Sequence, residues 1–316
     1  MGGRRCIVRG VRSRLTPPPN KVCKVRIDKG LSIDLSCTIL GAAAFPHRDG
    51  WADRLGAMLR TVRATQYVVP LREGGSLPAI VEADDQGMYV VKFRGAGQGR
   101  LALVAELVAG EIGRALGLNV PELVLIEIDA VLGRNEPDAE IRHLLKASVG
   151  CNVALDYLPG STMFDPAALD KASPEDASMG VWFDAFMQNV DRTPRNANLL
   201  VWHRKLYFID HGAALYFHHN WPTMPQKMAS PFLEIKDHVL LPWASEIREA
   251  AATAHARLTG DVMDGILANV PDAWLESVEE ERDAATARAA YREFFLGRLA
   301  KSAAFEEEAM RAHALL

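Results

Sequence analysis

The order in which strands and helices follow one another constrains this chain more than any other feature of its sequence. Short β-rich runs separated by turns fill residues 61–157, and helical patterns dominate from Asp165 onward. This segregation predicts an α+β fold, in which a β-rich half precedes an α-rich half. A length of 316 residues allows one large domain or two modest ones, each with a substantial core.

Strands are expected where apolar and β-branched residues lie between turn residues. The predicted strands are 66–71, 79–83, 88–94, 123–128, 151–157, 198–203 and 206–209. Apolar residues at helical spacing predict a helix over 101–116, and the last seventy residues, rich in Ala and Glu, have strong helical preference.

Charge divides the chain into two chemically different parts. Residues 1–60 carry 12 Lys and Arg against 4 Asp, whereas the whole chain has 36 basic and 40 acidic residues. The first part is therefore expected to be a basic, disordered leader. The acidic remainder argues against a broad nucleic-acid-binding face, because such a face needs clustered Lys and Arg.

Cysteine usage and hydropathy indicate the compartment. Of the four cysteines, only Cys151 lies after residue 60, so the body of the protein cannot contain a disulfide framework. No apolar run approaches the roughly 18 residues that a membrane-spanning helix needs. We therefore expect a cytoplasmic protein that does not associate with a membrane.

Two polar motifs in the second half suggest phosphoryl transfer. Asp191 precedes Asn196 by five residues, a spacing at which a carboxylate orients a hydroxyl and an amide oxygen holds Mg²⁺. Asp210 ends an apolar strand just before Gly212, where a second metal-binding carboxylate belongs. Either motif alone could simply form a turn, but together they are fairly specific.

Two further features lie in the first half. Lys92 lies within a β-rich run, a position comparable to that of a strand lysine that binds nucleotide phosphates. A lysine on an edge strand, however, often only keeps a sheet soluble. Glu106, beside small residues on the following helix, is a candidate ion-pair partner for Lys92, and Glu111 is its rival. A glycine turn upstream of the lysine lies where a loop could cover phosphates; its residues are Gly74, Gly75 and Ser76.

The order of these motifs resembles that of HipA-like kinases, over about residue 61 to the C-terminus. The resemblance implies a two-lobed protein-kinase-like fold, with a β-rich nucleotide-binding lobe at 61–157 and an α-rich catalytic lobe at 158–316. It implies ATP-dependent phosphorylation of a Ser or Thr hydroxyl, with ATP and Mg²⁺ required. The acceptor itself, a protein or a small molecule, is not implied.

The same resemblance assigns roles to single residues. Asp191 matches the catalytic aspartate, Asn196 and Asp210 match the metal ligands, and Lys92 matches the ATP lysine. The segment expected to pair with adenine contains Leu155, Asp156 and Tyr157. Two positions depart from conventional kinases, which often have His two residues before the catalytic Asp and Phe after the metal-binding Asp. They are Asn189 and His211, and both fit the HipA-like pattern better.

Three alternatives stay open. The run after Lys92 contains Gly95, Gly97 and Gly99 before a helix, as a dinucleotide-binding fold would, but Arg100 occupies the place of the required third glycine. A metal hydrolase could use the histidines, which are His203, His211, His218 and His219. A catalytically inactive ATP-binding module is the third alternative.

Overall fold

The computed structural model describes residues 58–316, apart from 72–76, 98, 135, 169–170 and 278–281, and two short strands nearer the N-terminus. The chain divides into two units, Met1–His47 and Arg48–Leu316. The first contains the antiparallel pair β1 (Cys23–Ile27) and β2 (Leu31–Leu35). Apart from this pair and residues 58–60, the leader that we predict to be disordered lies outside the described residues.

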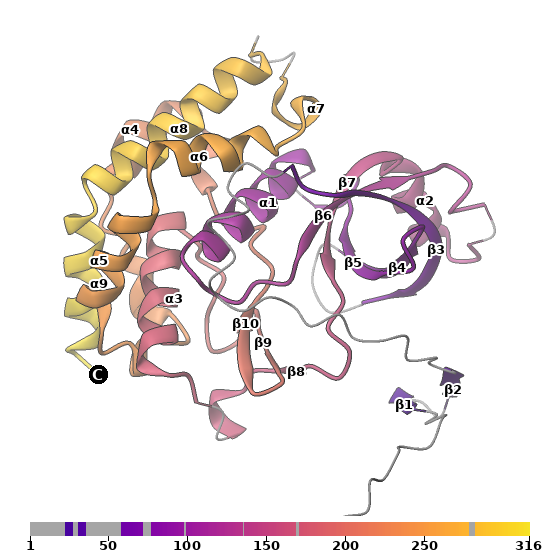
Figure 1. Ribbon diagram of the computed structural model, residues 1–316, viewed down its shortest axis with the longest axis horizontal. Helices are drawn as coiled ribbons and strands as arrows, with labels where there is room; N and C mark the ends of the chain where they lie inside the picture. The colour runs from indigo at the N-terminus through magenta and orange to yellow at the C-terminus, as the bar shows by residue number, and fades with distance from the viewer. Residues whose placement is uncertain are drawn as a thin grey trace, which may run out of the picture. The chain divides into compact units, whose positions relative to one another are not determined.

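A closed five-stranded barrel opens the second unit (Figure 1). Its strands are β3 (Thr61–Pro70), β4 (Ala79–Ala83), β5 (Met88–Lys92), β6 (Leu123–Ile128) and β7 (Gly150–Asp156), in the order β3-β4-β5-β7-β6. Neighbouring strands are antiparallel except β3 and β6, which close the barrel through a short parallel pairing. Two irregularities in the register of β3 bend that strand, as closure requires.

Two helices lie between strands of the barrel in the sequence. The helix α1 (Arg100–Ala115) follows β5 and buries eleven of its sixteen residues. The helix α2 (Ala139–Ala147) was not predicted. Its N-terminus is capped by the Asp138 carboxylate, which accepts hydrogen bonds from the backbone N–H groups of Glu140 and Ile141.

The remainder of the chain is mainly helical. Its α-helices are α3 (Pro174–Met187), α4 (Met224–Met228), α5 (Ile247–Arg257), α6 (Gly260–Ala268), α7 (Asp272–Leu275), α8 (Ala284–Ala300) and α9 (Ala303–His313). Single 3₁₀ turns occur at Pro166–Ala168, Tyr216–His219, Trp221–Thr223, Leu233–Asp237 and Leu241–Trp243. The helix α3 is buried around most of its circumference, packs against α5 and α9, and forms the centre of this part.

A small antiparallel sheet lies within the helical part, in the order β10-β9-β8. Its strands are β8 (Thr162–Met163), β9 (Leu199–Trp202) and β10 (Lys205–Phe208). The hairpin of β9 and β10 matches the predicted pair of strands, and its turn uses positive φ angles at His203 and Arg204. The hairpin matters for the site because β9 begins and β10 ends at the same end of the small sheet. The loop before β9 and the turn after β10 therefore lie next to each other.

Among the helices that the structure describes, none is long and apolar enough to cross a membrane.

Candidate active site

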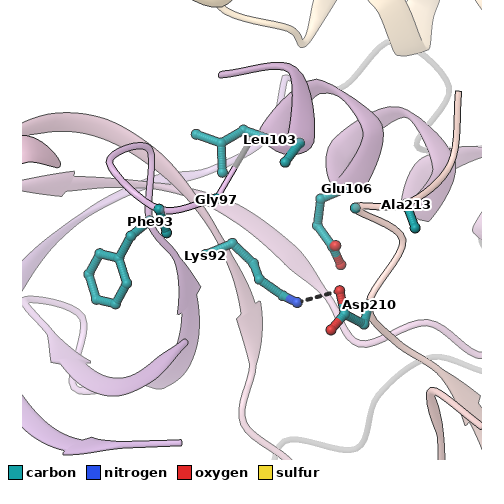
Figure 2. Close-up of a pocket in the computed structure, with 10 residues that line it drawn as sticks. Lys92, Phe93, Gly97, Leu103, Glu106, Asp210 and Ala213 are labelled. Carbon is teal, nitrogen blue, oxygen red and sulfur yellow. Dashed lines mark ion pairs between the residues drawn. The ribbon is translucent and has the colours of Figure 1, made fainter. Parts of the chain in front are cut away.

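A cavity of about 190 Å³ lies between β5, the start of α1 and the turn after β10. It is lined by Lys92, Phe93, Ala96, Gly97, Ala102, Leu103, Glu106, Asp210, Gly212 and Ala213. Figure 2 shows Lys92 and Glu106 pointing from separate elements toward Asp210. Because pockets for drug-sized ligands usually measure about 300–1,000 Å³, this cavity can hold only part of such a ligand.

Lys92 forms an ion pair with Asp210, the residue that follows the end of β10 by two positions. The Nζ atom lies 2.6 Å from Asp210 Oδ1, and 12% of the lysine side chain is exposed. Burial acts to lower the pKa of Lys92, but nearby carboxylates, Glu106 foremost, outweigh burial and raise it. Burial acts to raise the pKa of Asp210, and Lys92 more than offsets this and lowers it. Both groups are therefore charged near neutral pH.

Glu106 is a deeply buried carboxylate with one free oxygen. It is 1% exposed, and its Oε2 accepts a hydrogen bond of 2.8 Å from the backbone N–H of His211. Its Oε1 has no hydrogen-bond partner among the described residues. Burial, partly offset by Lys92, raises the pKa of Glu106 to about 7. The direct ion pair that we expected between Lys92 and Glu106 is thus replaced by the shorter contact of Lys92 with Asp210.

The orientation of α1 explains why Glu106, rather than Glu111, faces the cavity. A Cβ atom added to Gly110 would lie 2.9 Å from Leu123 Cδ1 on β6, so any larger residue would force this leucine side chain to shift. Glu111 lies 3.4 Å from Arg114 on its own helix and does not line the cavity.

Asp191 lies in the loop between α3 and β9, and hydrogen bonds fix its carboxylate. Its Oδ2 accepts from Asn196 Nδ2 at 2.9 Å and from Asn198 Nδ2 at 3.4 Å, and its backbone N–H donates to Asn189 Oδ1 at 3.2 Å. Asn196 uses its amide nitrogen on Asp191, so the atom that it could offer to a metal ion is its carbonyl oxygen. Asn198 is a contact that the sequence analysis missed.

Arg192 holds the Asp191 loop against the end of β10. Its buried guanidinium donates to the backbone carbonyls of Asn198 and Ile209. The Ile209 N–H also donates to the Asn198 carbonyl, at 3.1 Å. The two polar motifs predicted from the sequence are therefore joined through main-chain hydrogen bonds, which fixes Asp210 relative to Asp191.

Asp184, on α3, supports Arg192 and was not identified from the sequence. Its fully buried carboxylate accepts hydrogen bonds from Arg192 Nε, from Asn189 Nδ2 at 3.0 Å and from His238 Nε2 at 2.9 Å. Burial acts to raise the pKa of Asp184, but Arg192 and His238 outweigh it and lower the value to about 2. The sequence does contain a signal for it, a single carboxylate within the apolar run 181–187. A charge at such a buried position needs partners, which indicates a hydrogen-bonded or ion-paired role.

The predicted adenine-binding segment lies at the end of β7. Leu155 is buried in the core and pairs through its backbone with both β5 and β6. The N–H groups of the next two residues, Asp156 and Tyr157, donate to the carbonyls of Glu122 and Met88. These N–H groups are thus used within the barrel, and none of the three residues lines the cavity.

The predicted phosphate-covering turn, Gly74, Gly75 and Ser76, lies outside the described residues.

The dinucleotide-binding alternative is wrong in its topology. A glycine loop does connect β5 to α1, but both neighbours of β5 in the barrel, β4 and β7, run antiparallel to it. A dinucleotide-binding fold needs parallel strands on either side of the helix crossover. The metal-hydrolase alternative also loses support, because the described residues contain no group of three or more His, Cys, Asp or Glu side chains placed to hold one metal ion.

No curated protein sequence matches the chain. Among solved structures, a proinflammatory kinase of Helicobacter pylori, CtkA, aligns with a TM-score of 0.47 and 14% sequence identity. The alignment covers 81% of this chain and 98% of that one. A model of the HipA-like kinase family matches residues 65–308, and the chain therefore belongs to the HipA-like kinase family.

Proposed function

We propose that this protein is an ATP-dependent phosphotransferase that moves the γ-phosphoryl group of ATP to a hydroxyl acceptor. The observation that carries the proposal is the convergence of Lys92, Glu106 and Asp210 in one cavity, although they come from three different elements. A phosphate grip needs a buried cation beside carboxylates that can share a metal ion, and this cavity supplies both. In this proposal the barrel and the helical part are the two lobes of a protein-kinase-like fold.

The donor atoms fit a magnesium ion. Mg²⁺ prefers hard oxygen ligands, and Asp210 and the free carbonyl oxygen of Asn196 are of that kind. Glu106 Oε1 adds a buried oxygen to the cavity that Asp210 also lines, and among the residues that the structure describes it has no hydrogen-bond partner. Bound Mg²⁺ neutralises charge on the phosphates of ATP. Lys92, charged despite its burial, would contact the same phosphates.

Asp191 is the proposed catalytic base. The hydrogen bonds to its carboxylate from Asn196 and Asn198 go to Oδ2, so Oδ1 can receive the proton of the acceptor hydroxyl. The hydroxyl oxygen then bonds to the γ-phosphorus as the bond to the β,γ-bridging oxygen breaks. Main-chain contacts of Arg192 hold Asp191 in place during this step.

Adenine would lie beyond the end of β7. Since the N–H groups of Asp156 and Tyr157 are already used, contacts from this segment to the base would come from carbonyl oxygens or side chains. The acceptor remains a hydroxyl group on a protein or on a small molecule.

Labelled ATP tests the proposal. The purified protein would be incubated with Mg²⁺ and γ-³²P-ATP, alone and with a cell lysate, and compared with Asp191→Asn and Asp210→Ala. Asp191→Asn should bind MgATP normally but transfer phosphate about 10²–10⁴ times more slowly, the usual contribution of a general base. Asp210→Ala should weaken MgATP binding itself, because it removes a metal ligand.

Binding is measured separately by thermal shift, where a ligand at a hundredfold its Kd stabilises by about 2.7 kcal/mol. Asp237→Asn, at an exposed aspartate of the helical part, is the matched control and should behave as the wild type. Equal transfer by the wild type and Asp191→Asn would remove Asp191 from the mechanism. Binding of ATP without any transfer would make the protein an inactive ATP-binding module.

A further inference from the structure

His211 lies where three parts of the candidate site meet. It is 0% exposed, and it directly follows Asp210. Its backbone N–H donates to Glu106 Oε2 on α1, at 2.8 Å. Its ring Nδ1 lies 3.3 Å from Nη2 of Arg192, in the Asp191 loop. One residue thus contacts both the helix that carries Glu106 and the arginine that fixes the loop.

The contact with Arg192 defines the form of the imidazole. A guanidinium has only donors, so Arg192 Nη2 donates and His211 Nδ1 accepts. The ring proton therefore lies on Nε2, which is buried and has no partner among the described residues. A buried donor without an acceptor destabilises a fold, because its lost hydrogen bonds to water are not replaced.

Packing alone gives no reason for a histidine here. The ring packs edge-on against Phe183, with centroids 5.6 Å apart, a contact that a phenylalanine could make without a buried N–H. What a phenylalanine lacks is an acceptor for Arg192. Among the described residues, the other hydrogen bonds of that guanidinium are donated by Nε and Nη1. The acceptor for Nη2 is therefore His211 Nδ1.

We propose that His211 is a positioning residue for phosphoryl transfer, which orients Arg192 through its Nδ1 and Glu106 through its backbone N–H. The inference rests on the proposed function. It assigns His211 no contact with ATP or with the acceptor. Its side chain acts on the rate through the Asp191 loop, whereas nucleotide binding depends on Lys92 and Asp210.

Two substitutions separate the acceptor from the ring. His211→Phe keeps the ring volume and removes the acceptor. His211→Asn removes most of the ring, but its Oδ1 can stand where Nδ1 stood and accept from Arg192. We expect the Phe variant to melt at the higher temperature of the two and to have the lower kcat, at least about tenfold below wild type, a loss equal to about 1.4 kcal/mol. The Asn variant should keep kcat within about threefold.

Two further measurements do not depend on turnover. The Kd for MgATP should change less than about threefold in both variants, or about 0.7 kcal/mol at most. Amide hydrogen exchange across residues 192–198 should be faster in His211→Phe than in His211→Asn, because only the former frees the Arg192 side chain.

His218 offers a matched control. It is also buried, at 1% exposure, with Nδ1 bonded to Tyr291 at 2.9 Å and Nε2 without a partner. His218→Phe should change the melting temperature and leave kcat unchanged. A kcat that follows melting temperature across all three variants, or a His211→Phe enzyme as fast as wild type, would overturn the inference. A wild type that binds MgATP and transfers no phosphate would overturn the proposed function instead.

Discussion

Lys92 Nζ lies 2.6 Å from Asp210 Oδ1, so the proposed phosphate-binding cation and the proposed metal-binding carboxylate neutralise each other directly. Glu106, the second carboxylate of the cavity, receives its largest positive field from the same lysine and a smaller one from Arg192. Two carboxylates therefore rely mainly on one lysine, which makes the site sensitive to any added cation.

Removal of the lysine should expose this sensitivity. Lys92→Met leaves Asp210 and Glu106 without the lysine charge that they share, and should lower the free energy of unfolding by about 1–2 kcal/mol. This is less than the 3–5 kcal/mol lost on breaking a fully buried pair, because the Asp210 side chain is 40% exposed. Millimolar Mg²⁺ should stabilise the variant more than the wild type in thermal melts. Lys205→Met, at an exposed lysine of β10, is the control, and an equal Mg²⁺ effect on all three proteins would contradict the prediction.

The buried carboxylate on α3 gives a second prediction. Asp184→Asn leaves the Arg192 guanidinium buried without its counter-charge and should cost about 3–5 kcal/mol of unfolding free energy at pH 7. Since the pKa of Asp184 is lowered to about 2, its stabilisation is present above about pH 4 and is lost as pH falls through 2. Urea unfolding at pH 7 measures the loss. Glu307→Gln, at an exposed position of α9, should change stability by less than about 0.5 kcal/mol.

The raised pKa of Asp156, at the end of β7, predicts a pH dependence of stability opposite to that of Asp184. Burial and the nearby Glu122 raise the pKa of Asp156 from 3.8 to about 6. Between these values the folded protein keeps a proton that the unfolded chain has lost, so stability falls as pH rises from about 4 to 6. Asp156→Asn should therefore melt higher than wild type at pH 8 and equally at pH 3.5. A difference that is the same at both pH values would show that ionisation of Asp156 is not its cause.

The first residues of the barrel limit how far the chain can be shortened from its N-terminus without loss of stability. We expect a chain that begins at Met58 to melt at the same temperature as the full chain, because the basic leader has no clear apolar period. A chain that begins at residue 65, where the family match begins, lacks the residues of β3 that pair with β6. It also lacks Arg60, which bonds Asp85 and Glu122. It should melt many degrees lower, and an equal melting temperature for both truncated chains would refute this role.

Local signals in the sequence predicted much of this fold. The strands at 79–83 and 123–128 match β4 and β6 residue for residue, because turn residues and β-branched runs mark their ends. The helix α2 escaped prediction since it is short and only three of its residues are buried. Closure of the barrel was not predicted either, because the pairing of β3 with β6 joins segments that no local sequence pattern connects.

Three of the residues predicted for the site, Lys92, Glu106 and Asp210, line one cavity, but their contacts were not predictable. Spacing identified Asp191 and Asn196, and strand position identified Lys92 and Asp210. The actual partner of Lys92 depends on where the β10 turn lies in space, which the sequence does not encode locally. The bond between Asp184 and His238 was invisible for the same reason, since it joins residues 54 positions apart.

Barrel closure also limits how a peptide could be recognised. Strand addition needs a row of unpaired backbone groups along a sheet edge. Closure of the barrel covers the edge of β3 over Thr61–Arg63, where it pairs with β6, but not over the rest of that strand. In the small sheet, the outer side of β10 already exchanges hydrogen bonds with Asn119. Among the described residues of the small sheet, the other outer edge is that of β8, which is two residues long. A peptide that added a strand to the barrel would therefore have to pair with β3 beyond Arg63, where the pairing with β6 has ended.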